Sequence, residues 1–159
     1  MIDAASVALI EEQIARDGRS LLQYVGEADP YTPAPAEGAR RRLTALAREN
    51  QEAVGQLMRF LHRAHVTPPL LGTYPTNFTT INFVSLAHVL PALRKDQERG
   101  IAQLERGIAA LPESDGRHLL WQYLEMKRRH LRELEAIARD DAEAERAQPS
   151  VIPSEKISH

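Results

Sequence analysis

Cysteine is absent from this chain of 159 residues, and that absence removes several kinds of chemistry together. Disulfides, thiolate zinc sites, iron–sulfur clusters and cysteine nucleophiles all need a sulfur atom that the chain does not supply. An excess of charge of one sign is absent too, because the formal net charge is −2. A nucleic-acid binder needs a basic surface that displaces counterions from phosphates, so we expect no nucleic-acid partner.

Long apolar runs are also missing. None approaches the roughly 20 residues that cross a bilayer, so we expect no membrane partner. The opening stretch, MIDAASVALIEEQIARDG, has no basic region ahead of its apolar residues and therefore does not resemble a signal peptide. Together these features predict a soluble, cytoplasmic protein.

What the chain does contain is helical periodicity. Four stretches repeat apolar residues with the spacing of an amphipathic helix, and none alternates as a strand does. The predicted helices are Asp3–Val25, Ala36–His65, Thr79–Leu111 and Arg117–Arg146. Pro91 falls inside the third pattern and predicts either a kink or a later helix start. We therefore expect an all-α four-helix bundle over residues 1–146, followed by a flexible tail over residues 147–159.

The lengths of the connections predict a topology. About five residues join the third and fourth helices, which favours an antiparallel pair. Residues 66–78 join the second and third helices, and 13 extended residues reach roughly 43 Å, slightly more than the roughly 36 Å of a 24-residue helix. That connection is long enough to cross the whole bundle, although a loose loop between antiparallel neighbours is the alternative.

Each predicted helix carries a polar residue near its middle, where its apolar stripe calls for an apolar one. These inward residues are Asp17, Asn50, Gln97, Lys127 and His130. Buried polar groups lose free energy unless they are paired, so one or more on every helix suggests a shared layer. Within that layer Asp17 and Lys127 could neutralise each other, with the remaining members supplying hydrogen bonds. The alternative is that several of them lie at the edge of the stripe and reach solvent.

The arrangement resembles the ferritin-like superfamily, in particular its rubrerythrin-like branch, over roughly residues 3–140. That family has an acid on the first and third helices and Glu-x-x-His on the second and fourth. Asp17 precedes Asn50 by 33 residues, a spacing similar to that between the first acid and the first motif. The resemblance puts Asn50 and Ala53 at the first Glu and His, Gln97 or Arg94 at the second acid, and Lys127 and His130 at the second Glu and His.

The departures from the motifs bear on function. A ferritin-like di-iron site uses about four carboxylates and two imidazoles, whereas this layer has one carboxylate, one imidazole, two amides and an ammonium. The resemblance thus implies a degenerate di-metal site without a cofactor. We expect a non-catalytic module that serves oligomerisation or partner binding through its helix faces or the 66–78 crossover. The alternative is a di-iron or other metal-dependent oxidoreductase, or an iron-handling protein, with atypical ligands.

A different helix register would favour that alternative. A shift of each helix by one residue would turn a second set of side chains inward, and Glu49 and Glu52 would then share a face. The set is Glu12, Glu49, Glu52, Asp96, Glu125 and His130. The same shift would expose Leu46 and Val54, so the first register is the one that we expect.

Overall fold

The computed structural model describes residues 2–28, 37–83 and 85–147. Every regular element in this part of the chain is helical, so the predicted all-helical class is confirmed. The elements are α1 (Ala4–Asp17), α2 (Leu21–Ala28), α3 (Glu37–Arg63), the 3₁₀ helix η2 (Thr76–Phe83), α4 (Leu86–Ala109) and α5 (Asp115–Ala147). Most of the predicted tail, residues 148–159, lies outside the described residues. No helix in the described ranges combines the length and hydropathy needed to span a bilayer.

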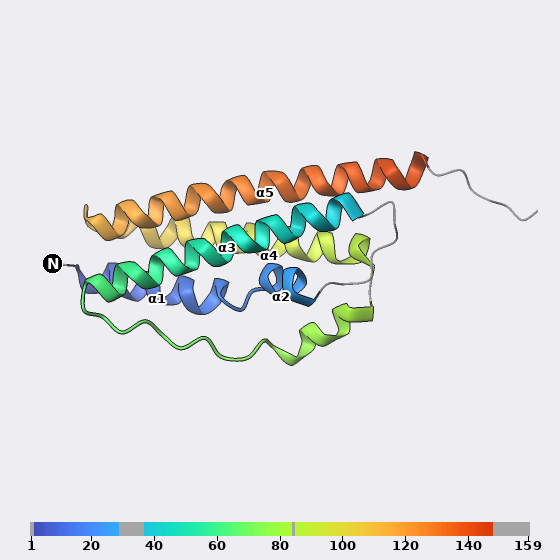
Figure 1. Cartoon of the computed structure of the whole chain (residues 1–159). Helices are drawn as coiled ribbons and strands as arrows, with labels where there is room; N and C mark the ends of the chain where they lie inside the picture. Colours follow the sequence, from blue (N-terminus) through green and yellow to red (C-terminus); the bar gives the residue numbers. More distant parts are fainter. Residues whose placement is uncertain (1, 29–36, 84, 148–159) are drawn as a thin grey trace, which may run out of the picture.

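The helices lie side by side along one long axis (Figure 1). α1 and α2 run in one direction and α3 returns beside them, while α4 and α5 form a second antiparallel pair. The connection from α3 to α4 travels back along the length of the molecule, so that α3 and α4 point the same way. The long 66–78 connection thus crosses from one end to the other, as its length allows.

The first predicted helix, Asp3–Val25, is two helices. α1 ends at Asp17, the Gly18 N–H bonds to the Ile14 carbonyl, and α2 begins at Leu21. Glycine disfavours helix interiors, and the Ser20 hydroxyl accepts a hydrogen bond from the Gln23 N–H, as residues at helix starts do. Because of this break, Asp17 is the last residue of α1, and α2 starts as a separate helix that packs against α3.

The third predicted helix, Thr79–Leu111, starts later than the apolar pattern suggested. Residues Thr76–Phe83 form the 3₁₀ helix, and α4 begins at Leu86 after an extended Ser85. Pro91 lies inside α4, five residues after its first residue, so the helix lacks the N–H that would otherwise donate to the Ala87 carbonyl. The helix starts later than the pattern predicted, but ahead of Pro91 and not at it.

Two apolar clusters fill the interior, one on each side of the polar layer. One includes Ile10, Ile14, Leu57, Leu61, Leu104, Leu120 and Leu124. The other includes Leu22, Val25, Leu43, Leu86, Leu90, Leu93, Leu134 and Ile137. Burying each such side chain contributes about 1.5–3 kcal/mol, so the fold has two sources of stability with a polar region between them.

The crossover is tied to the break between α1 and α2. Arg19 Nε donates to the Gly72 carbonyl at 2.8 Å, and the Tyr24 and Tyr74 rings meet edge to face at 5.1 Å. Leu71 lies so close to Gly18 that a Cβ there would come within 2.4 Å of Leu71 Cδ2. The small residue at the break therefore makes room for the chain that passes over it.

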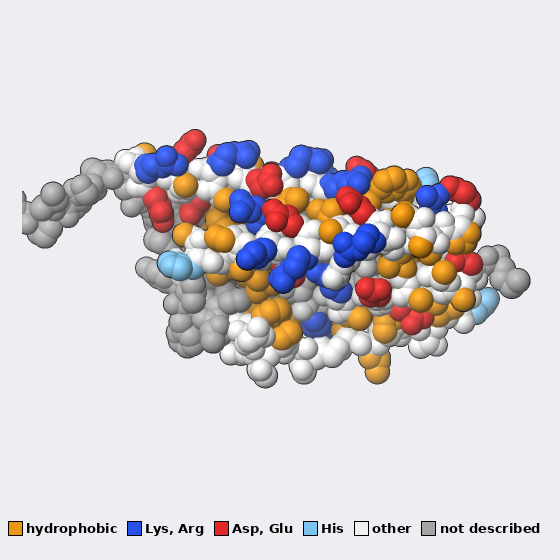
Figure 2. Space-filling view, turned by 180° about the vertical axis from the view of Figure 1, so that it is seen from behind, with side chains coloured by type: hydrophobic (Ala, Val, Ile, Leu, Met, Phe, Trp, Pro, Cys, Tyr) orange, Lys and Arg blue, Asp and Glu red, His pale blue; other side chains and the backbone are white. Residues whose placement is uncertain are grey.

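The surface mixes both signs of charge. Basic and acidic side chains are interleaved over the face shown in Figure 2. The described residues form ion pairs such as Arg128–Glu105 at 2.9 Å and Arg94–Glu98 at 3.7 Å.

Candidate functional site: a buried polar layer

All five polar residues of the predicted layer are buried. Their exposed fractions run from 0% for His130 to 7% for Gln97, with Asp17 and Lys127 at 3%. They come from α1, α3, α4 and α5, and Ala53 of α3 is partly buried. The five therefore do not reach solvent at the edge of the stripe.

A buried ion pair joins two helices within this layer. Lys127 Nζ of α5 lies 3.0 Å from Asp17 Oδ2, the carboxylate at the end of α1. The Tyr123 hydroxyl, one turn before Lys127, donates to the same oxygen at 2.6 Å. The Lys127 ammonium also lies 5.7 Å from the centre of the Tyr123 ring. Asp17 thus receives both a positive charge and a neutral donor in a site closed to water.

Tyr123 keeps its proton in this environment. Burial raises the pKa of Tyr123 well above its ordinary value, and the nearby Asp17 charge raises it further. Its hydroxyl is therefore a permanent hydrogen-bond donor to the carboxylate over the physiological pH range.

The two carboxamide side chains of the layer, Asn50 and Gln97, donate hydrogen bonds to backbone carbonyls and not to the charged side-chain groups. Asn50 Nδ2 donates to the Asp17 carbonyl at 3.0 Å and to Gln23 Oε1 at 3.3 Å. Gln97 Nε2 donates to the Lys127 carbonyl at 2.9 Å. Asn50 and Gln97 thus supply hydrogen bonds to the two residues of the charge pair, as expected, and each bond goes to a backbone carbonyl.

Space for the lysine comes from α4. A Cβ built on Gly100 would lie 3.4 Å from Lys127 Cε and from the Arg16 guanidinium. These are ordinary van der Waals separations, so the Cβ of alanine would fit at Gly100 and only a longer side chain would crowd the stem of Lys127.

His130 belongs to a second charged group, at the side of the layer. Its Nε2 lies 3.1 Å from Glu49 Oε2, and Glu49 also pairs with Arg129. Glu49 is 39% exposed, whereas the His130 side chain is 1% exposed, so this pair spans the boundary between core and solvent. Neither ring nitrogen of His130 has a well-aligned hydrogen bond among the described residues. His130 therefore does not bond to the Asp17–Lys127 pair, contrary to expectation.

The pKa values of this second group follow from the same geometry. Burial lowers the pKa of His130, and the neighbouring Glu49 opposes that shift. The Arg129 guanidinium lowers the pKa of Glu49, assisted by His130. At neutral pH the imidazole is thus uncharged and the carboxylate is ionised.

The shifted helix register is not the one that forms. Glu12, Glu52 and Glu125 are exposed, while Leu46 and Val54 remain buried. Asp96 is partly buried, and its Oδ1 lies 3.7 Å from Arg16 Nη2. The described residues hold no group of three or more His, Asp or Glu that could bind a metal ion. Keeping the apolar stripes buried decides the register, because exposing them would lose far more free energy than the acids would gain.

The layer does not fit a di-metal centre. Its carboxylate is already neutralised by an ammonium at 3.0 Å, and its two carboxamides are engaged with backbone carbonyls. Two divalent cations in this space would meet the positive charge of Lys127 without enough anionic ligands to offset it.

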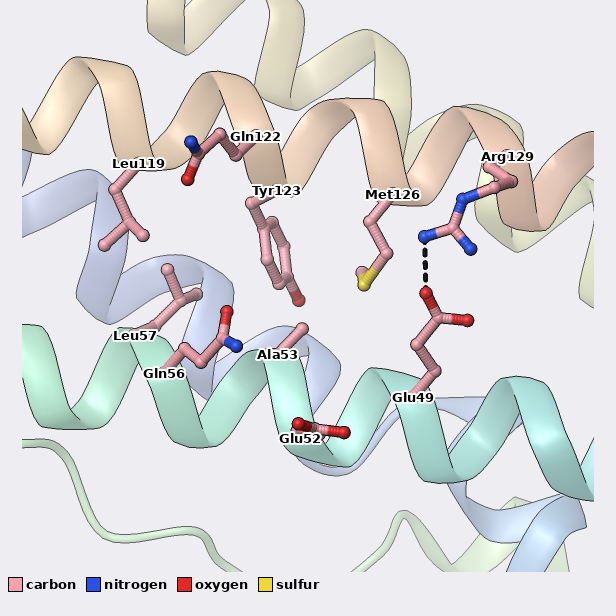
Figure 3. Close-up of a pocket in the computed structure, with 10 residues that line it drawn as sticks. All are labelled: Glu49, Glu52, Ala53, Gln56, Leu57, Leu119, Gln122, Tyr123, Met126 and Arg129. Carbon is pink, nitrogen blue, oxygen red and sulfur yellow. Dashed lines mark hydrogen bonds and ion pairs between the residues drawn. The ribbon is translucent and has the colours of Figure 1, made fainter.

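A cavity of about 260 Å³ lies next to this layer, between α3 and α5. Figure 3 shows Ala53 facing the Tyr123 ring across it, with the Glu49–Arg129 ion pair at one end. Ala53 is the position that the resemblance assigned to a histidine. A small side chain here leaves open the volume that a ring would fill.

Sequence reasoning missed Tyr123 and Gln23. Tyr123 lies one turn from Lys127 on the same face, a spacing that brings side chains together, so it was detectable in principle. Gln23 turns inward only because the helix breaks at Gly18. Comparison of this chain with protein families, with curated proteins and with solved structures finds no match.

Proposed function

We propose that this chain is a ferritin-like four-helix module in which a charge-paired polar layer replaces the di-metal site. The observation that carries the proposal is the Lys127 ammonium 3.0 Å from Asp17, two residues that the resemblance assigns to ligand positions. A fixed protein cation at such a position supplies the positive charge that a metal would otherwise supply. The crossover between parallel α3 and α4 further supports the ferritin-like type of connection.

The proposed role is non-catalytic and works through the surface, in oligomerisation or in binding a protein partner, within the cytoplasm. Large exposed hydrophobic side chains among the described residues are Trp121 and Leu70, which are 45% and 97% exposed. Leu70 lies on the crossover and Trp121 on an outer face of α5, so each offers an apolar contact on a mostly charged surface.

Elemental analysis tests the degenerate site. Protein produced in medium supplemented with iron and manganese is expected to carry well under one metal ion per chain. Close to two ions per chain, lost when His130 is replaced by Ala, would instead support the iron-dependent alternative with atypical ligands.

Light scattering tests the surface role. A particle mass that is a multiple of 17.8 kDa, reduced by Trp121→Ser or Leu70→Ser, supports oligomerisation. A single-chain mass that neither substitution changes leaves a partner protein as the proposed role. Arg106→Ser, at an exposed position of α4, serves as the surface control.

A further inference from the structure

The cavity between α3 and α5 has the size of a small ligand. It measures about 260 Å³ and is open to solvent on the side of the exposed Glu52, Gln56 and Gln122, whereas a closed cavity of about 150 Å³ holds a benzene molecule. Ordinary drug-sized pockets begin at about 300 Å³, so only a compact molecule fits here. The cavity exists because Ala53 faces Tyr123 with too few atoms to fill the space between them.

The walls favour a flat apolar body. The Tyr123 ring, the Met126 thioether and the Leu57 and Leu119 side chains line the space, as Figure 3 shows. Aromatic rings pack well against other rings and against methionine sulfur. The hydroxyl of Tyr123 is bonded to Asp17, so the ring is held in place as a wall.

The charges at the rim favour a cation. Two carboxylates and one guanidinium line the cavity, which leaves one net negative charge. Arg129 is engaged by Glu49, whereas Glu52 has no ion pair or hydrogen bond among the described residues. A guest with a positive charge could pair with Glu52, while an anionic guest would be repelled.

We propose that this cavity is a binding site for a small organic cation, an ammonium group carried on a compact aromatic body. The aromatic part lies against the edges of Tyr123 and Met126, which are 4% and 8% exposed, and the ammonium group pairs with Glu52 on the solvent side. Gln56 and Gln122, which also line the cavity, offer carboxamide oxygens to the remaining N–H groups. The site does not depend on the role proposed above for the module.

Methionine methyl resonances provide a direct test on the full chain. The chain has three methionines, and Met126 lines this cavity while Met58 lines a different one near Leu71. Benzylammonium is expected to shift the Met126 methyl resonance and to leave the Met58 resonance unchanged. The expected dissociation constant is roughly 1 mM, which suits a ligand of this size. Benzyl alcohol and benzoate have the same ring without the positive charge, and are expected to bind at least about tenfold more weakly.

Substitutions localise the effect. Ala53→Leu fills the cavity and is expected to abolish the Met126 shift. Glu52→Gln, at an exposed position that leaves the core intact, is expected to weaken benzylammonium binding roughly fivefold, whereas the matched Glu12→Gln on α1 changes nothing. The proposal is overturned if benzylammonium leaves the Met126 resonance unmoved, if benzoate or benzyl alcohol binds as well, or if Glu52→Gln behaves like Glu12→Gln.

Discussion

Lys127 and His130 lie about one turn apart on α5, and each faces a carboxylate in different surroundings. Asp17 and Lys127 are both closed to water, and the carboxylate gains a second donor from Tyr123. His130 is equally buried, yet its partner Glu49 is 39% exposed and is shared with Arg129. The first pair completes its interactions inside the protein, whereas the second leaves part of them to solvent.

The comparison shows that a buried polar group is not always a fully hydrogen-bonded one. A buried charge is tolerated only when its partner is held in place, and removing that partner strands it. A buried neutral imidazole without aligned hydrogen bonds carries a smaller penalty, which grows when it takes up a proton. The Asp17–Lys127 pair should therefore matter most for stability at neutral pH, and the His130–Glu49 pair for its pH dependence.

Breaking the closed pair should have the largest effect. Asp17→Ala or Lys127→Ala leaves an uncompensated charge in the core and is expected to lower the free energy of unfolding by roughly 3–5 kcal/mol. Replacing both charges, as Asp17→Leu with Lys127→Met and Tyr123→Phe, should restore most of that loss because no lone charge or unpaired hydroxyl remains. Urea denaturation followed by helical circular dichroism measures all of these variants. Single losses under about 1 kcal/mol that simply add would contradict the closed pair.

Removing the Tyr123 hydroxyl tests whether the Asp17 carboxylate also depends on its second hydrogen-bond donor. Tyr123→Phe deletes the hydroxyl bonded to the Asp17 carboxylate and keeps the ring that packs in the core. The expected loss is about 1.5–3 kcal/mol, the range for a hydrogen bond to a charged group. Combined with Asp17→Ala, the same substitution should have a much smaller additional effect, because the acceptor has already gone. Equal effects in both backgrounds would show that the hydroxyl does not act through Asp17.

The His130–Glu49 pair should make the free energy of unfolding depend on pH. Burial lowers the pKa of His130, so the folded protein disfavours the protonated imidazole relative to the unfolded chain. The stability that this provides is complete above the ordinary pKa of histidine and is lost as the pH falls below it, by at most about 1.4 kcal/mol per pH unit for one proton. The measurement is the free energy of unfolding from about pH 7.5 to about pH 5, where Glu49 with its lowered pKa stays ionised.

Two variants isolate the histidine. His130→Leu should flatten the pH dependence over this range, because it removes the group that takes up the proton. His62→Gln, which changes an exposed histidine near the end of α3, should leave it as steep as in the parent protein. An unchanged slope in His130→Leu would assign the pH dependence to other groups.

The smallest effect is expected at the solvent side of the second pair. Glu49→Gln breaks an ion pair whose partners are 39% and 54% exposed, and should lower the stability at neutral pH by under about 1 kcal/mol. The same carboxylate-to-amide change at Asp17 should have a clearly larger effect, because Lys127 is then left without its counter-charge. Denaturation of the two variants side by side makes the comparison, and equal losses would remove the distinction between the two pairs.

Particular residues show how far sequence reasoning reached. The inward positions of Asp17, Asn50, Gln97, Lys127 and His130 follow from the helical period, and all five are buried. The residues that complete their bonding were not predictable in the same way. Glu49 precedes the inward residue Asn50 on α3. It reaches His130 only because of how α3 is rotated about its own axis relative to α5. Gln23 joins Asn50 only because α2 starts a new helix after Gly18.

The sequence by itself determined the helical class, the apolar stripes and the polar residues that interrupt them, because these depend on periods within one helix. Only the tertiary structure decided which polar groups meet. The bond from Tyr123 to Asp17 spans 106 residues, and the one from Lys127 to Asp17 spans 110. Such contacts depend on the relative rotation and axial position of separate helices. The packing of the whole core determines that rotation and position, including Gly18, where a Cβ would collide with Leu71.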